Sequence, residues 1–210
     1  MAESPTPFTL SESARRLGAY RWVELRLFEV TGGWVTAVPE LEVKLTLATL
    51  SSHHAWRADL WLEWLPATAE LTVDGLTVPA TDAVAGLLDA VARPAEPGLT
   101  IEKLVGVYRV VIPRTIAAYS FHLTHTSTVA DAPVIRALRF ALGDEMEDWR
   151  AGEALLQSLI RSDDDARRAA SRQAELEVLA VRAGGIAGPG SIGGPGAVDP
   201  RVESPDSASP

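Results

Sequence analysis

The sequence predicts an all-α protein built as a bundle of four long helices, and three observations carry this prediction. Apolar residues recur at the 3.6-residue helical period in four long stretches. Short connections join the first two stretches and also the last two, whereas residues 66–100 separate the second from the third. Because short connections place consecutive helices side by side, two helix pairs joined by one long crossover describe a four-helix bundle.

The first long helix is expected over residues 10–31. Thr9 and Glu12 have the spacing of a capping box, in which each side chain bonds the backbone N–H of the other residue. Gly32-Gly33 ends the periodic pattern, because glycine is common just beyond a helix. This stretch therefore carries both a start and a stop signal.

The second long helix is expected over residues 40–65, since Pro39 suits a helix start and Pro66 marks a stop. Residues 67–80 break the helical period, and Asp74-Gly75 lies there between short alternating apolar runs, which indicates a hairpin turn. We interpret this segment as a crossing loop with some strand character.

Two capping threonines start the next helices. Thr81 is expected to cap a short helix that ends near Arg93. Thr100 is expected to cap the third long helix, over residues 101–128. Pro113 falls inside this helix and should kink it or split it, because proline has no backbone N–H to donate.

The fourth long helix starts at Asp131-Ala-Pro133, an acidic cap followed by proline in the first turn, and runs to residue 160. Ser162 followed by three aspartates indicates a new helix N-terminus. The expected division of the chain is a flexible N-terminus over residues 1–9, a bundle over 10–162, an additional helix over 163–182 and a disordered Gly/Pro/Ser-rich tail over 183–210.

Composition limits the function classes. The chain has 210 residues, of which 47% are hydrophobic, and a formal charge of −9. Its basic residues are scattered, so we expect no nucleic-acid partner. No signal-peptide pattern and no apolar run long enough for a bilayer is present, so we predict a cytoplasmic protein with no membrane partner. Without cysteine, the strong metal ligands are His, Asp and Glu.

The stretch ALGDEMEDWRAGEALL, residues 141–156, is unusually acidic for a core helix. Glu145 and Asp148 fall on the stripe that also carries Leu138, Ala141, Gly152, Leu155 and Leu159. The outward set is Asp144, Glu147 and Glu153. A buried carboxylate requires a partner, a proton or a metal, so we expect arginine and histidine partners for the inner pair.

A more specific interpretation is that these acids belong to a metal site in the bundle core. Bundles of this kind bind metal pairs through carboxylates and histidines that project inward from facing helices, and such ligands suit iron or manganese. Here the inward candidates are Glu24, His54, His122, Glu145 and Asp148. No catalytic residue and no substrate can be assigned from the sequence.

Each candidate also has a purely structural interpretation. Glu24 could pair with Arg21 or another cation at the edge of the core. The adjacent His53 and His54 are typical of one core-facing, hydrogen-bonded histidine beside one at the surface. His122 could cap backbone groups freed by the proline kink.

Over residues 10–160 the chain resembles the ferritin-like superfamily, which includes di-iron carboxylate oxygenases and tRNA-hydroxylase-like proteins. The resemblance rests on the helix order, the long crossover, Glu24, His54 and the helix containing DEMEDWRAGEALL. It implies two bound irons and oxygen activation or ferrous-iron oxidation. The chain departs from the family pattern where Ser51 replaces a bridging glutamate and Asp148 replaces a histidine, and its third helix offers only Tyr119 and His122.

Two functions follow from these expectations. The first is a metal-dependent oxidoreductase, using iron or manganese in an altered carboxylate and histidine site. The alternative is a non-catalytic, metal-free ferritin-like protein whose ligand positions form a buried polar network. Such a binding or scaffold protein would form a homodimer or hold a partner through helix surfaces, above all the tryptophan-rich second helix. A docking role for the tail is a weaker third hypothesis.

Overall fold

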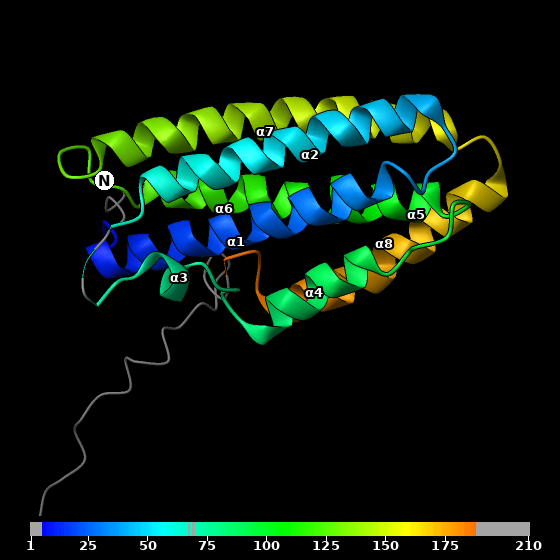
Figure 1. The fold of residues 1–210 in the computed structure, drawn as a ribbon. Helices are drawn as coiled ribbons and strands as arrows, with labels where there is room; N and C mark the ends of the chain where they lie inside the picture. Colours follow the sequence, from blue (N-terminus) through cyan, green and yellow to red (C-terminus); the bar gives the residue numbers. More distant parts are fainter. Residues whose placement is uncertain (1–5, 67, 69, 188–210) are drawn as a thin grey trace, which may run out of the picture.

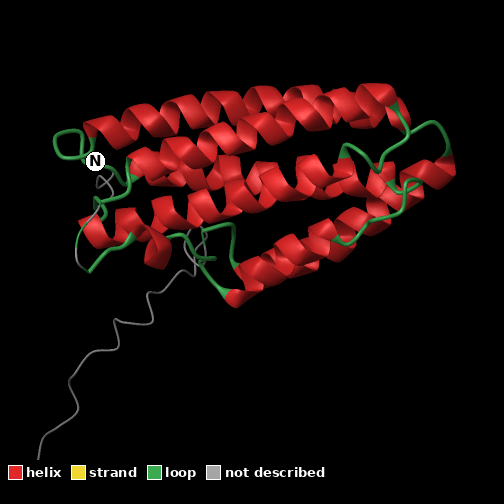
Figure 2. Cartoon of the chain, in the orientation of Figure 1, coloured by secondary structure: helices red, strands yellow, loops and turns green. Residues whose placement is uncertain are grey.

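A computed structural model describes residues 6–66, 68 and 70–187, and every regular element within them is helical (Figures 1 and 2). The predicted all-α class is therefore confirmed. The elements are α1 (Leu10–Trp34), α2 (Leu41–Glu63), α3 (Val73–Leu76), α4 (Asp82–Ala92), α5 (Thr100–Val105), the π-helix η1 (Gly106–Val111), α6 (Ile112–Thr124), α7 (Ala132–Leu159) and α8 (Asp163–Ala183). None of the helices in these ranges has the length and apolarity to cross a membrane.

The long helices lie side by side in two neighbouring pairs (Figure 1). Helices α1 and α2 run in opposite directions and pack against each other, α7 packs against α6, η1 and α5, and α2 also contacts α7. The crossover through α3 and α4 returns along the bundle to the end where α5 begins. Helices α4 and α8 pack against each other and cover α1, α5 and η1. The four-helix arrangement thus carries an extra helical layer on one side.

The start of α1 agrees with the sequence, but its end does not. Both hydrogen bonds of the capping box between Thr9 and Glu12 are present. Gly32 and Gly33 do not end the helix, which continues to Trp34. A Cβ on Gly32 would lie 2.9 Å from Oγ of Ser51 on α2. The glycine at this position therefore permits a close approach of α1 and α2.

The predicted hairpin in the crossover is wrong. Asp74 and Gly75 lie inside the short helix α3, which Thr72 caps by accepting a hydrogen bond from the Gly75 N–H. Tertiary packing explains the difference, because Leu76 is buried against α1 at Gly18. A Cβ on Gly18 would lie 2.2 Å from the Leu76 carbonyl oxygen, so the crossover is held directly against α1. Residues 67 and 69 lie outside the described part of the chain.

The third long segment is helical without a break from Thr100 to Thr124, with a π-helical turn just before Pro113, and it is not capped as predicted. Thr100 is the first helical residue, and its hydroxyl donates to the carboxylate of Glu40 at 2.9 Å instead of capping the helix. The π-helix η1 ends directly before Ile112, whose N–H bonds the carbonyl of Val107. This wider turn shifts the hydrogen-bond register just before Pro113, which has no N–H to contribute. The segment ends at Thr124 rather than at residue 128.

Helices α7 and α8 begin where the sequence predicts. Pro133 lies in the first turn of α7, but the Asp131 carboxylate accepts a bond from the Ser127 N–H and does not cap the helix. Ser162 caps α8 by accepting from the Asp165 N–H at 3.1 Å. Helix α8 ends at Gly184, whose φ of 69° is the left-handed conformation that glycine adopts readily.

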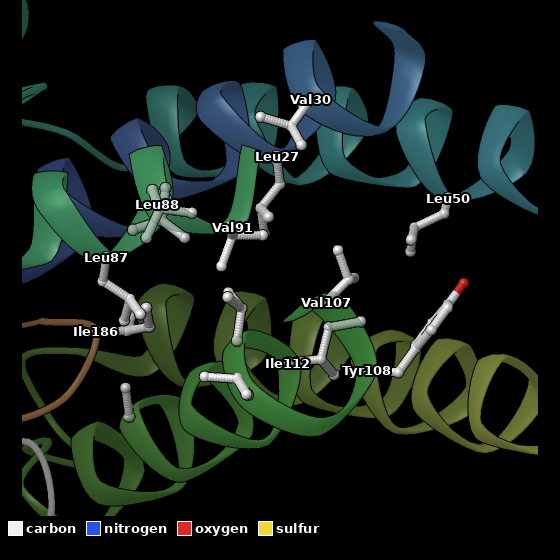
Figure 3. Close-up of a cluster of buried hydrophobic side chains, with 14 of the residues drawn as sticks. Leu27, Val30, Leu50, Leu87, Leu88, Val91, Val107, Tyr108, Ile112 and Ile186 are labelled. Atoms are coloured by element: carbon white, nitrogen blue, oxygen red, sulfur yellow. The ribbon is translucent and has the colours of Figure 1, made fainter. Parts of the chain in front are cut away.

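The ends of the chain are described only in part. Residues 1–5 of the predicted flexible N-terminus and residues 188–210 of the predicted tail lie outside the described residues. Within the described part, the Phe8 N–H donates to the carbonyl of His125. Ile186, just beyond α8, is fully buried near Leu87 of α4 (Figure 3).

One apolar core runs from the bundle into the extra layer (Figure 3). Leu87, Leu88 and Val91 of α4 are fully buried and meet side chains from both the bundle and the segment after α8. Burial of side chains of this size contributes about 1.5–3 kcal/mol each. This continuous packing positions the long helices around a polar centre deeper in the bundle.

Candidate metal centre

Three of the five predicted metal ligands meet in the core. Glu24 of α1, His54 of α2 and Glu145 of α7 have no exposed surface, and one ligand atom from each lies within 4.8 Å of the others. Helical periodicity explains the convergence, because each residue lies on the inward face of its own helix. The structure therefore brings together side chains from three helices that are distant in sequence.

The other two candidates lie elsewhere. Asp148 belongs to a second group, with His53 and Asp144, which is only partly buried. His122 is buried, and its Nε2 lies 3.3 Å from the hydroxyl of Ser13. In the described part of the chain His122 joins neither metal-like group, so its predicted place in the centre is wrong.

Arg57, which was not predicted from the sequence, lies among the ligands of the centre. Its guanidinium is fully buried, with Nε 3.2 Å from Glu24 Oε1 and 3.3 Å from Glu145 Oε1. Nη1 lies 2.9 Å from Asp148 Oδ2 and also bonds Asp144, which was predicted to face outward. The spacing of three residues after His54 puts both on one helix face, and this signal was available in the sequence.

Glu24 is paired with Arg57 and His54, not with Arg21. Arg21, the partner considered from the sequence, instead donates to the hydroxyl of Thr77 at 3.0 Å. The expectation of arginine and histidine partners for Glu145 and Asp148 is confirmed, because Arg57 contacts both carboxylates and His53 contacts Asp148. His53 lies at the surface and bonds Asp148 at 2.8 Å, as the adjacent pair of histidines predicted.

The two buried glutamates differ in charge. Burial alone would raise the pKa of Glu24, but Arg57 and the bonds from His54 and Tyr119 lower it to about 2. Burial raises the pKa of Glu145 well above its usual value, and the nearby Glu24 charge adds to this effect while Arg57 opposes it. The 3.3 Å contact with Arg57 would favour ionised Glu145, but Arg57 is shared among several acids. With no metal bound, these pKa shifts favour ionised Glu24 and protonated Glu145.

His54 is oriented as a metal ligand would be. Nδ1 lies 2.6 Å from Glu24 Oε2 and 2.9 Å from Arg57 Nη2. A proton on Nδ1 donates to the ionised carboxylate, which is the stronger bond of the two. This tautomer leaves a lone pair on Nε2, and burial together with the Arg57 charge lowers the pKa of His54 against the opposing charge of Glu24. In this tautomer Nε2 is the atom that His54 can offer to a metal ion.

Several buried polar atoms of this centre make no hydrogen bond. Nε2 of His54 and both carboxylate oxygens of Glu145 are buried and make no hydrogen bond within the described residues. Leaving a buried polar atom unpaired costs about 1–3 kcal/mol. The donor set of two carboxylates and one imidazole suits iron or manganese. The residues present therefore fit a bound transition-metal ion.

Aromatic side chains close one side of the centre. The Tyr119 hydroxyl donates to Glu24 Oε1 at 2.6 Å, and Trp61 Nε1 donates to the Tyr119 oxygen at 3.1 Å. The Tyr20 ring packs edge-on against Tyr119, with ring centres 4.8 Å apart. Burial and the Glu24 charge raise the pKa of Tyr119 well above its usual value, so this phenol keeps its proton.

A surface cleft lies on the side of Asp148. It has a volume of about 270 Å³ between α2 and α7 and is lined by residues that include Thr49, Tyr108 and Asp148. Asp148 bonds Arg57, which in turn contacts Glu24 and Glu145. Asp148 and Arg57 therefore lie between the cleft and the two buried glutamates.

No match to this chain is found among protein-family models, curated proteins or solved structures.

Proposed function

We propose that this protein is a ferritin-like bundle that binds iron or manganese through Glu24, His54 and Glu145 and uses the metal in oxidation and reduction. The observation that carries the proposal is that His54 Nε2 and both oxygens of Glu145 make no hydrogen bond in a fully buried centre, although Arg57 Nε lies 3.3 Å from Glu145 Oε1. Native proteins pair nearly all buried polar atoms, so unpaired ones that converge require an explanation. A bound cation would satisfy them together.

The charges of the centre support a cation. Without one, burial and then the nearby charge of Glu24 raise the pKa of Glu145, which favours its protonated form. A divalent ion would replace that proton and attract both carboxylates, as metal binding commonly releases protons from its ligands. The fixed bond from Tyr119 to Glu24 and the bond from His54 to Glu24 would hold this ligand in position.

A redox role is supported by the surroundings. Iron or manganese would supply one-electron chemistry, and three protein ligands leave coordination positions open. Trp61 and Tyr20 shield the centre from water on one side. The cleft beside Asp148 offers a small molecule a place to bind near the centre, separated from it by Asp148 and Arg57.

The alternative is a non-catalytic bundle with no metal, and Arg57 is the observation that favours it. Its guanidinium neutralises Glu24 and contacts three further carboxylates, which makes a buried polar network without any ion. A scaffold of this kind would offer Trp56 and Trp149, the exposed tryptophans of α2 and α7, to a second copy or a partner. Trp61 is unavailable for this role because it is buried.

Metal loading decides between the two. The protein is reconstituted anaerobically with ferrous iron or with manganese, washed and examined by elemental analysis, and then exposed to oxygen while its absorption spectrum is recorded. We expect bound metal in the wild type, an oxygen-dependent spectral change with iron, and loss of both in Glu145→Gln and His54→Ala.

The matched control is His122→Gln, which alters the other fully buried histidine of the described chain. It should load metal like the wild type. Wild-type protein that stays metal-free after reconstitution would reject the proposal and leave the non-catalytic bundle. Metal that binds without any reaction with oxygen or peroxide would reject the redox part alone.

A further inference from the structure

We propose that the guanidinium of Arg57 takes the place of a second cation in the centre, so that each chain binds a single metal ion. This inference rests on the proposed function, because it concerns how many ions the same site accepts. In this role Arg57 is not a metal ligand but a fixed positive charge among the ligands.

The position of Arg57 is the first argument. Nε lies 3.2 Å from Glu24 Oε1 and 3.3 Å from Glu145 Oε1, so it bridges the two carboxylates that belong to the candidate site. The same guanidinium binds Asp144 and Asp148 with Nη1. One buried cationic group therefore already contacts four carboxylates from α1 and α7.

The permanence of its charge is the second argument. An arginine side chain stays protonated at any ordinary pH. Arg57 therefore cannot give up its charge by losing a proton, unlike a histidine at the same place.

Charge balance is the third argument. The two fully buried carboxylates, those of Glu24 and Glu145, carry −2 when ionised, so Arg57 with one divalent ion leaves a net charge of +1 in the buried centre. A second divalent ion would raise that net charge to +3. Unbalanced buried charge is strongly unfavourable.

The supply of ligands is the fourth argument. The Ser51 hydroxyl faces α1, where it donates to the carbonyl of Phe28 at 3.0 Å. The Tyr119 hydroxyl donates to Glu24 at 2.6 Å. With Arg57 in place, the fully buried group of possible ligands is Glu24, His54 and Glu145, which suits one ion with open positions.

The test is a metal count on three proteins, namely the wild type, Arg57→Gln and Arg57→Lys. Each is titrated anaerobically with Co²⁺ and, separately, with Mn²⁺, and bound metal is measured by elemental analysis after washing. We expect one ion per chain in the wild type, one in Arg57→Lys, which keeps a cation, and two in Arg57→Gln, which frees the acids around the guanidinium.

The outcomes separate this inference from the proposed function. No metal in the wild type would overturn both, whereas two ions in the wild type would overturn this inference and leave the proposed function standing. One ion in a folded Arg57→Gln would also overturn it, and two ions would support it.

A second measurement covers the case in which Arg57→Gln does not fold. The electron paramagnetic resonance spectrum of wild-type protein saturated with Mn²⁺ should be that of an isolated ion. A spectrum of two magnetically coupled ions would contradict the role assigned to Arg57. Since this experiment needs only the wild type, the inference stays open to refutation.

Discussion

Gly152 of α7 packs against a buried ring so closely that even a methyl group should disturb the fold. A Cβ at this position would lie 1.9 Å from Cε1 and 2.0 Å from Cζ of Tyr108. Tyr108 belongs to the π-helix η1 and is 1% exposed, so its ring has little room to move. Gly152→Ala therefore tests whether this helix contact limits the packing of α7 on η1.

The magnitude follows from two opposed effects. Replacing glycine by alanine inside a helix contributes up to about 1 kcal/mol of stability. Overpacking a core costs about 1–3 kcal/mol, and the overlap with ring atoms places Gly152→Ala at the upper end of that range. The net result is a loss of about 2 kcal/mol relative to the wild type.

Gly143 of the same helix supplies the matched control. It is exposed, and a Cβ there would meet no atom within 4 Å, so Gly143→Ala should only gain the helical preference. The difference between the two variants removes that shared gain and isolates the steric effect, about 3 kcal/mol. Equilibrium unfolding in urea, followed by circular dichroism, measures both.

The double variant Gly152→Ala with Tyr108→Ala identifies the cause. Without the ring, the methyl group at residue 152 has space, so adding Gly152→Ala to Tyr108→Ala should not reduce stability further. Equal unfolding midpoints for Gly152→Ala and Gly143→Ala would show that η1 can move away from the new methyl group without loss of stability. The reasoning from the overlap would then be wrong.

Three further predictions use single side chains. Ser162→Ala removes the cap of α8 and should cost about 1 kcal/mol in urea unfolding, while Asp163→Ala, beside it, should cost less. Tyr119→Phe leaves Glu24 without its phenol donor and should cost about 1.5–3 kcal/mol by the same assay. His122 has its pKa lowered from 6.5 to about 3, mainly by burial, so it is neutral when folded and protonates on unfolding. Stability should therefore fall as the pH drops from 6.5 toward 3, by up to about 1.4 kcal/mol per pH unit, and His122→Gln should show a shallower fall.

The helical elements could be predicted where local signals decide them. The capping pair Thr9 and Glu12 and the cap at Ser162 form as the sequence indicates, because these bonds need only residues three apart. Thr100 does not cap its helix, and its hydroxyl donates a hydrogen bond to a distant acid, Glu40. Local spacing describes the first kind of bond and contains no information on the second.

Glycine caused the clearest error in a helix boundary. Gly32 and Gly33 looked like a stop signal, yet α1 passes through them because Gly32 is needed at the contact with Ser51 of α2. Glycine serves both at helix ends and where backbones approach closely. Which of the two applies depends on what lies opposite, and that is a property of the assembled bundle.

For the candidate site, the sequence could predict which residues face inward on each helix. Periodicity places Glu24, His54 and Glu145 inward on three helices, and the fold brings them together. The same reasoning put Asp144 outside, but it reaches Arg57. The miss arises because an arginine side chain is long enough to meet acids from more than one position around a neighbouring helix, while periodicity describes only the direction of each Cβ.

Arg57 also explains how four acids on two helices can belong to a stable core. Replacing a buried ion pair by apolar groups is often neutral, whereas removing one partner is strongly destabilising, by about 3–5 kcal/mol. Sliding α2 along α7 would separate Arg57 from Glu145 and Asp148 and so carry a cost of the second kind. Apolar contacts between the same helices could re-form after such a shift, so they specify the register less sharply. The acidic stretch of α7 thus sets the alignment of the helices that bring Glu24, His54 and Glu145 together, whichever of the two functions holds.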